Sequence, residues 1–409
     1  MSASDAGFSG SASIELRHAG RWLSGGTPDT GEDRYWGGNI PWISAASLKS
    51  FEINDSERRV TELGVRSGSR LVPEGTVMFV VRGMSLKNEF RVGITGRPVA
   101  FGQDCKAIIP GEGIDGRYLA YFLLSRSDFF LRSADESGHG TKRLETRAVA
   151  DVKLPLLPLP EQRKIVEVLD AVDESIDAAE RTAVKMDILR VGAVSSLIDS
   201  PCFLEDLGSY IISGPQNGLY KHQSAYGGSG IPILRIDGFG GGVISEPGSL
   251  RRLSVTPEEG ALYGLKESDL VINRVNAIDY VGKSAIVRGL RELTVFESNI
   301  MRVKVQEEKL LPAFAAHMLS GSKCLRYFRS QARSAIAQAS INQRDVRSCP
   351  IAVPSLDEQH RIVSVIETHD ARIAAERAQL GKLRKLKAGL MDDLLTGRVR
   401  VDQLENLPV

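Results

Sequence analysis

The chain has 409 residues, of which 42% are hydrophobic and 25% charged, and its formal net charge at pH 7 is +1. A chain of this length is too long for one ordinary hydrophobic core, so we expect two to four domains. Because the net charge is close to zero, any surface that binds nucleic acid must be a local basic patch. The cysteines Cys105, Cys202, Cys324 and Cys349 form no CxxC pair, which argues against a zinc site or a disulfide framework.

The first 13 residues are small and polar, and we expect them to be disordered. They lack the basic start and apolar core of a signal peptide. No apolar run in the sequence approaches the ~20 residues of a membrane-spanning helix. The sequence therefore predicts a cytoplasmic protein without a membrane partner.

From residue 14 to about 152 the pattern is mixed, strand-rich and glycine-rich. Short apolar runs between turn residues predict buried strands at 40–44 and 77–81. The apolar segment 118–124 has the length and spacing of a buried helix. A flexible basic loop at 137–143 and an apolar strand at 152–157 complete this region, which we take as the first domain, residues 1–157.

A long helix is predicted for residues 158–200. Apolar residues recur along it at steps of three and four, which places them on one stripe: Ile165, Val168, Leu169, Val172, Ile176, Ala179, Ala183, Met186 and Leu189. At ~1.5 Å per residue this helix is roughly 60 Å long. An apolar stripe of that length needs a partner helix.

The partner comes from an internal repeat. The motif PLPEQ at 158–162 returns as PSLDEQ at 354–359, again opening a long helix, and placing Glu161 on Glu358 aligns the two helices without a gap over about 40 residues. Residues 202–353 repeat the order of the first region at lower identity. The second helix has its inward stripe at Ile362, Val365, Ile366, Ile373, Leu380, Leu383, Leu386 and Leu390.

The repeat predicts an α+β fold in which two mixed α/β domains are each followed by a long helix. The second domain covers 201–353 and the second helical region 354–409. We expect the two helices to pair as an antiparallel coiled coil with pseudo-twofold symmetry, holding two domains at a fixed separation. The helices are alike and the domains have diverged, which favours a shared scaffold carrying two different readers.

Three motifs carry a family resemblance: GGTP at 25–28 with IPWI at 40–43, LPLLPLPEQRKIV at 154–166, and KAGLMDDLLTGRV at 387–399. In this order they resemble the specificity subunits of type I restriction-modification systems, with two target recognition domains and two conserved helical regions. The resemblance covers nearly the whole chain. The first helix departs from it at 195–199, which lacks the LLTG ending of the second.

The resemblance implies a non-catalytic subunit in which each recognition domain reads one half of a bipartite double-stranded DNA site. The helices would set the spacer and dock two methyltransferase subunits, and motor-nuclease subunits would join them. S-adenosylmethionine and ATP are expected in those partners, with no cofactor or metal in this chain. The alternative is a coiled-coil scaffold that pairs proteins and has no DNA sequence readout of its own.

The residues themselves offer no enzymatic machinery: there is no GxxxxGK[ST] phosphate loop, no amino-methylation tetrad and no dinucleotide-binding fingerprint. DNA contacts must come from polar side chains that can enter a groove. Candidates in the first domain are Arg82, Ser85, Lys87, Asn88, Arg91, Lys142 and Arg143. Candidates in the second are Gln216, Asn217, Tyr220, Lys221, Arg235, Arg274, Asn276, Lys283, Gln338 and Asn342. For each residue alone, an ordinary solvated surface position is the competing interpretation.

Overall fold

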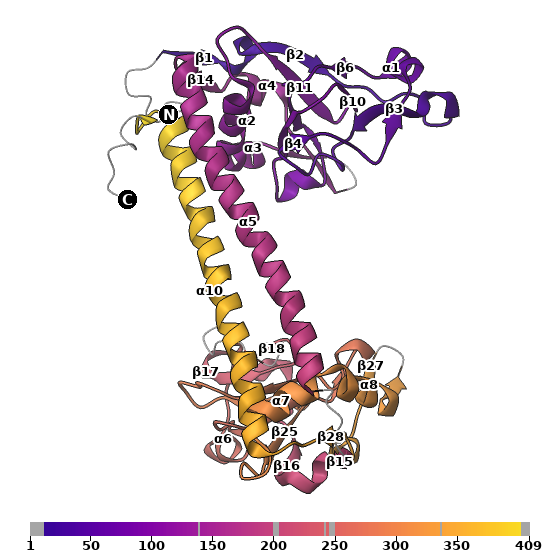
Figure 1. Cartoon of the computed structure of the whole chain (residues 1–409), viewed down its shortest axis with the longest axis vertical. Helices are drawn as coiled ribbons and strands as arrows, with labels where there is room; N and C mark the ends of the chain where they lie inside the picture. Colours follow the sequence, from indigo (N-terminus) through magenta and orange to yellow (C-terminus); the bar gives the residue numbers. More distant parts are fainter. Residues whose placement is uncertain are drawn as a thin grey trace. The chain divides into compact units, whose positions relative to one another are not determined.

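The computed structural model describes residues 12–137, 140–198, 204–240, 243–244, 250–335 and 338–401. The chain forms two compact units, one made of residues 1–180 and 378–409 and the other of residues 181–377 (Figure 1). Each unit contains one globular domain and parts of two long helices. Most of the leader expected at 1–13 lies outside the described residues, but Ser13 is already part of the first strand, β1.

The first domain is built around a five-stranded sheet. Its strand order is β2 (Gly20–Ser24), β11 (Cys105–Pro110), β7 (Val77–Val80), β9 (Val92–Thr95) and β4 (Glu52–Ile53). Only the edge strand β4 runs parallel to its neighbour. All four residues of β7 are buried, as expected for an apolar run without alternation. The strand predicted at 77–81 is therefore confirmed.

A second sheet has the order β5 (Arg59–Val60), β3 (Trp36–Ile43), β10 (Val99–Phe101) and β6 (Leu71–Val72). Its strand β3 confirms the strand predicted at 40–44. Helix α1 (Glu62–Gly68) lies beside this sheet and is capped by Thr61, whose hydroxyl accepts from the amide of Gly64. Two small sheets complete the domain: β1 (Ser13–Glu15) with β14 (Lys153–Pro155), and β12 (Asp135–Ser137), β13 (Thr141–Arg143) and β8 (Arg82–Gly83).

The helix predicted at 118–124 is α2 (Gly116–Ser125), and α3 (Ser127–Arg132) and α4 (Thr146–Ala150) follow it. Asp115 caps α2 by accepting from two backbone amides of the first turn. Tyr118, Tyr121 and Phe122 of α2 are fully buried. The Tyr121 hydroxyl lies 2.6 Å from Asp170 and 2.8 Å from Asp173 of the long helix α5 (Leu159–Ile198), so α2 joins the domain to this helix.

The second domain repeats this plan, but its two corresponding sheets have four and three strands instead of five and four, and it has an additional two-stranded sheet. One sheet has the order β16 (Ile211–Asn217), β25 (Ile300–Val305), β21 (Leu270–Asn273) and β23 (Ser284–Ile286). Two sheets have three strands each: one has the order β20 (Arg252–Leu253), β17 (Tyr226–Leu234) and β24 (Val295–Phe296), and the other β22 (Val275–Asn276), β27 (Gln338–Ser340) and β26 (Arg333–Ala335). Two further sheets have two strands each: β15 (Leu204–Asp206) with β28 (Pro350–Ala352), and β18 (Phe239–Gly240) with β19 (Val243–Ile244). Its helices are α6 (Pro257–Tyr263), α7 (Pro312–Ser320), α8 (Ser322–Gln331) and α9 (Gln343–Arg347).

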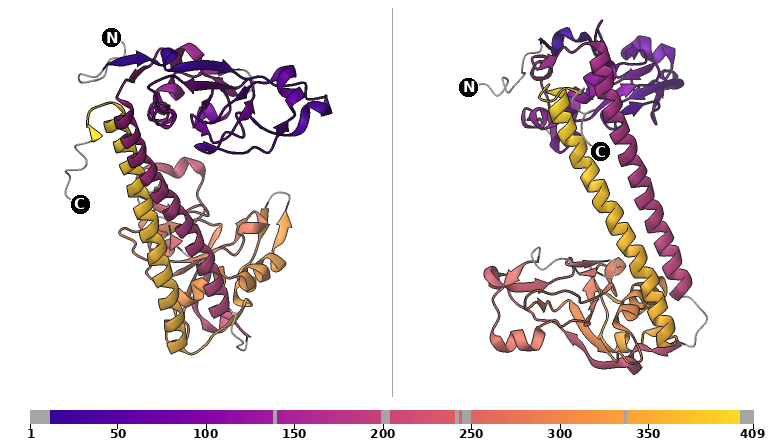
Figure 2. Two further views of the ribbon diagram at one scale, coloured as in Figure 1. Left: turned by 45° about the horizontal axis from the view of Figure 1, so that its top comes forward. Right: turned by 60° about the vertical axis from the view of Figure 1, so that its left-hand side comes forward.

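The two long helices are α5 (Leu159–Ile198) and α10 (Leu356–Leu395). Within the first unit, Asp173 of α5 pairs with Lys387 of α10 at 2.6 Å, and Glu180 pairs with Arg384 at 2.6 Å. Within the second unit, Asp187 pairs with Arg377 at 2.7 Å. In each unit the helices lie side by side, and residue numbers rise along one as they fall along the other (Figure 2). The predicted antiparallel pairing is confirmed.

The inward stripe needs one correction. Ile165, Leu169 and Ile176 are buried as expected, but Leu189 and its counterpart Leu386 are 54% and 51% exposed. An α-helix drifts by ~20° per heptad relative to a strict seven-residue repeat, so a stripe extrapolated from one end leaves the contact face. Beyond Ala183 the space beside α10 is taken by the ion pair of Arg190 with Asp370.

The repeated glutamine joins each domain to its helix. The Gln162 side chain is 1% exposed; its amide nitrogen donates to the carbonyl oxygens of Gly113 (2.8 Å) and Leu157 (2.7 Å), and its oxygen accepts from the amide of Asp115 (2.9 Å).

Gln359 repeats this arrangement in the second unit, with the carbonyls of Lys309 (3.0 Å) and Pro354 (2.9 Å) and the amide of Leu311 (2.8 Å). Three hydrogen bonds satisfy a side chain that would otherwise be costly to bury. The requirement for glutamine in the repeated motif follows from this geometry.

Candidate nucleic-acid interface

The structure gathers most candidates of the first domain around one short sheet. Strand β13 pairs antiparallel with β8, so that Arg143 lies opposite Arg82 and Lys142 opposite Gly83. The 3-10 helix at Ser85–Lys87 follows β8 directly, and a side-chain carbon placed on Gly140 would lie 3.4 Å from Nζ of Lys87. Residues far apart in the sequence thus form one basic cluster.

The members of this cluster differ in how free they are. Arg82, Lys87, Asn88 and Arg143 are exposed, and within the described residues none of the three cations has a carboxylate partner. Arg91, in contrast, is held by Glu89 at 2.7 Å and by the carbonyl of Ala45 at 3.2 Å. The hydroxyl oxygen of Ser85 is buried without a hydrogen-bond partner. The exposed cations are the ones free to meet an anion. Residues 138–139 of the predicted basic loop lie outside the described residues.

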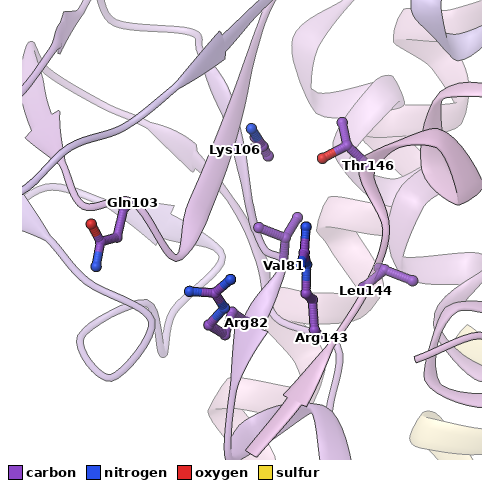
Figure 3. Close-up of a pocket in the computed structure, with 7 residues that line it drawn as sticks. All are labelled: Val81, Arg82, Gln103, Lys106, Arg143, Leu144 and Thr146. Atoms are coloured by element: carbon purple, nitrogen blue, oxygen red, sulfur yellow. The ribbon is translucent and has the colours of Figure 1, made fainter. Parts of the chain in front are cut away.

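Three polar residues that sequence reasoning missed, Gln103, Lys106 and Thr146, lie beside this cluster. A pocket of about 290 Å³ is lined by Val81, Arg82, Gln103, Lys106, Arg143, Leu144 and Thr146 (Figure 3). Lys106 comes from β11, an interior strand of the five-stranded sheet, and donates to the hydroxyl of Ser24. Burial, and then the charge of Arg143, lower the pKa of the Lys106 ammonium. Lys106 lies in an otherwise apolar run, so only the spatial pairing of strands reveals its role.

Candidates of the second domain fall into three groups. The first, at the end of β16 and just after it, comprises Gln216, Asn217, Tyr220 and Lys221. The Gln216 oxygen accepts from Arg302, and Lys221 pairs with Glu259 at 2.6 Å. Tyr220 is 78% exposed. Tyr220 and Asn217 are thus the exposed members of this group.

The second group consists of Arg235, which directly follows β17, and Lys283, and both make contacts within the domain. Arg235 pairs with Glu297 at 3.4 Å, and Lys283 donates to the carbonyl of Ile236 at 3.1 Å. The ammonium of Lys283 also lies 4.8 Å from the ring centre of Phe239. These contacts give both cations a structural role within the domain.

The third group lies at β22 and β27, the counterparts of β8 and β13, and comprises Arg274, Asn276, Gln338 and Asn342. Arg274 donates to the carbonyl of Ser298 at 3.1 Å, and the Asn276 side-chain oxygen accepts from the backbone amide of Ala277 at 2.8 Å. Asn342 caps α9, where its oxygen accepts from the amides of the first turn. Gln338 is exposed at the start of β27. None of these contacts tests DNA binding, so all the candidate residues stay predictions.

A family model described as "Type I restriction modification DNA specificity domain" matches residues 19–186 and 260–385. The chain belongs to this family. The two matches fall one on each copy of the internal repeat. Among the described residues, no helix is long and apolar enough to cross a membrane, and no cluster of three or more histidine, cysteine or acidic side chains could hold a metal ion.

Named relatives are specificity subunits of type I restriction enzymes. The EcoR124I/EcoR124II subunit of Escherichia coli is 32% identical over 160 residues, which are 39% of this chain and 40% of that protein. The MjaIX subunit of Methanocaldococcus jannaschii is 32% identical over 168 residues, 40% of this chain and 38% of that protein. These alignments therefore span only about two fifths of the relatives. The StySPI subunit of Salmonella potsdam is 24% identical over 356 residues, covering 80% and 74%.

Solved structures of the family share the fold. The S subunit from M. genitalium covers 94% of this chain and 96% of its own, with 12% identity and a TM-score of 0.55. A chain from a type I R-M system covers 96% and 100%, with 16% identity and a TM-score of 0.62. The predicted fold class, two mixed α/β domains each followed by a long helix, is confirmed.

Proposed function

We propose that this specificity subunit reads a bipartite DNA site, one half with each globular domain, while α5 and α10 set the gap between the halves. The observation that carries the proposal is the contrast between the copies. The joint is repeated bond for bond at Gln162 and Gln359, whereas the side chains at the candidate interface differ. A shared scaffold with divergent readers suits a target whose halves differ in sequence.

The side chains at the candidate interface differ although the backbone hydrogen bonds that hold them are the same in both domains. The amide of Leu144 donates to the carbonyl of Val81 at 2.8 Å, and in the second domain Ile341 donates to Arg274 at 3.0 Å. By this register Arg82 corresponds to Val275. Sequence is read through side chains placed in a groove, so different side chains on the same backbone favour different bases.

The gap follows from helix length. Each long helix has 40 residues, which at ~1.5 Å per residue corresponds to roughly 60 Å. Since duplex DNA rises by ~3.4 Å per base step, this length corresponds to somewhat under 20 base pairs. We infer a target with two half-sites separated by a gap of fixed length.

The long helices would also dock two methyltransferase subunits, with motor-nuclease subunits joining the complex. Exposed apolar side chains on α5 support a protein partner there: Val184, Ile188, Leu189 and Val191 are 60%, 67%, 54% and 62% exposed. Apolar side chains gathered on one surface are typical of an interface. Methyl transfer and DNA cleavage would then belong to the partners, which would bind S-adenosylmethionine and ATP.

Mapping adenine methylation in cells that carry the complete system tests the proposal. Replacing the first domain by that of a relative should change one half of the methylated site and leave the other half and the gap unchanged. Inserting four residues at matching levels of α5 and α10 should widen the gap by about 6 Å of helix rise. A site that ignores the domain exchange would favour the scaffold alternative, and an unchanged gap would refute the ruler.

A further inference from the structure

The pocket beside β13 is lined by three cations that do not stand together in the sequence. We propose that it binds one phosphate group of the DNA backbone and that this site exists in the first domain only. The inference rests on the proposed function, because it takes DNA as the source of the phosphate.

Three cations from three strands surround the pocket: Arg82 from β8, Lys106 from β11 and Arg143 from β13 (Figure 3). Arg82 and Arg143 are opposite each other in the strand pairing. Across the described parts of the chain, no carboxylate forms an ion pair with any of the three. Gln103 and Thr146 add neutral groups that can donate hydrogen bonds.

This arrangement favours an anion. Like charges held together repel, and the repulsion is reflected in the lowered pKa of Lys106, to which Arg143 contributes after burial. Guanidinium groups bind phosphate through paired N–H donors, and an ammonium adds a point charge. At about 290 Å³ the pocket exceeds the ~30 Å³ share of one water several-fold, which leaves room for a phosphate group with ordered water.

The second domain supplies an internal comparison. In the strand pairing, Cys105 lies opposite Val80, and Ile300 lies opposite Asn273. Val80 and Asn273 are equivalent, because each directly precedes the residue whose carbonyl accepts from Leu144 or Ile341. Lys106, which follows Cys105, and Met301, which follows Ile300, therefore occupy the same position in the two copies.

The strand pairing also gives the second-domain counterparts of the other two cations, Arg82 and Arg143. Arg82 faces Arg143 in the first domain, and Val275 faces Ser340 in the second. All three charges are thus replaced by uncharged side chains on matching strands. The second domain has a cation of its own nearby, since Arg274 stands in the place of Val81, but its guanidinium donates to the carbonyl of Ser298 at 3.1 Å. The set of three cations is therefore a property of the first copy.

A phosphate contact has a recognisable signature. It positions the protein on the duplex without distinguishing bases, so its loss weakens binding to all sequences alike. Each neutralised phosphate also contributes ~0.9 to the slope of log K against log salt. Free phosphate or another small anion could use the same chemistry, so the test must separate the two sources.

The test compares the full chain with the triple variant R82V/K106M/R143S, which installs the residues of the second domain. Binding to two unrelated DNA duplexes is measured by fluorescence anisotropy across a salt series. We expect the variant to bind both duplexes about tenfold more weakly at low salt and to lose roughly one unit of slope, as predicted for one phosphate. R66S, which removes an exposed arginine that pairs with Glu62 at 3.7 Å, is the control and should leave the slope unchanged.

Titration with inorganic phosphate alone identifies the source. If the triple variant loses phosphate binding while its DNA slope stays that of the wild type, the pocket takes a free anion and the proposal is wrong. An unchanged slope without phosphate binding in either protein also overturns it. If the wild-type chain binds no duplex at all, the proposed function itself fails. Should the triple variant unfold, R82V and R143S measured singly carry the test, since both side chains are exposed.

Discussion

Removing the side chain of Gln162 should destabilise the first unit by several kcal/mol. In Gln162→Ala the amide of Asp115 and the carbonyls of Gly113 and Leu157 lose their partners, which lie at 2.9, 2.8 and 2.7 Å. A buried polar group left without a partner costs about 1–3 kcal/mol. Allowing for partial relaxation, we expect a loss of roughly 4 kcal/mol from the three groups together.

Thermal unfolding followed by circular dichroism measures this loss. For a unit of about 200 residues, each kcal/mol shifts Tm by roughly 2–4 °C, so the expected fall is about 8–16 °C. Hydrogen exchange should also accelerate at the amide of Asp115. Gln379→Ala, which truncates an exposed glutamine of α10, is the matched control, and Gln359→Ala should reproduce the effect in the second unit. If Gln162→Ala melts within about 2 °C of the control, the joint does not depend on these bonds.

Two further predictions concern the side chains that join the helices to the domains. Tyr121→Phe removes a hydroxyl that lies 2.6 Å from Asp170 and 2.8 Å from Asp173. We expect it to lower the free energy of unfolding, measured with urea, by about 1.5–3 kcal/mol. The control Tyr280→Phe, at a 56% exposed position, should leave this free energy unchanged. His317 has its pKa lowered, mainly by burial, against opposing contributions from the nearby carboxylates of Asp370 and Glu367. Because the unfolded chain then takes up a proton more readily than the folded one, stability should fall as pH drops below about 6.5, and His317→Gln should flatten that dependence in a pH series of urea midpoints.

Sequence periodicity predicted much of this fold because the decisive signals are local. The pairing of the helices follows from stripes that include Ile165 and Ile362, and the repeat follows from aligning Glu161 with Glu358. The exposure of Leu189 was not predictable, because the direction in which a long helix turns its side chains depends on what its partner places opposite. At Leu189 the ion pair of the neighbouring Arg190 with Asp370 determines which side chains face α10.

The candidate interface was predictable only in part. Arg82 and Lys87 follow an apolar strand and are visible as a polar segment, and Lys142 and Arg143 are visible as a basic loop. Their meeting depends on the pairing of β8 with β13, which no local pattern contains. Lys106 is concealed for the same reason, since its charge reaches the pocket from a strand whose other residues build the core.

The joints at Gln162 and Gln359 have a consequence for how such proteins change over time. Every partner of these two side chains is a main-chain atom. The bonds therefore demand a backbone path but no particular amino acid on the domain side. A recombination event that exchanges one globular domain for another with the same path would leave the connection intact. On the proposed function, a new target specificity would then arise in one step without a matching change in the helices.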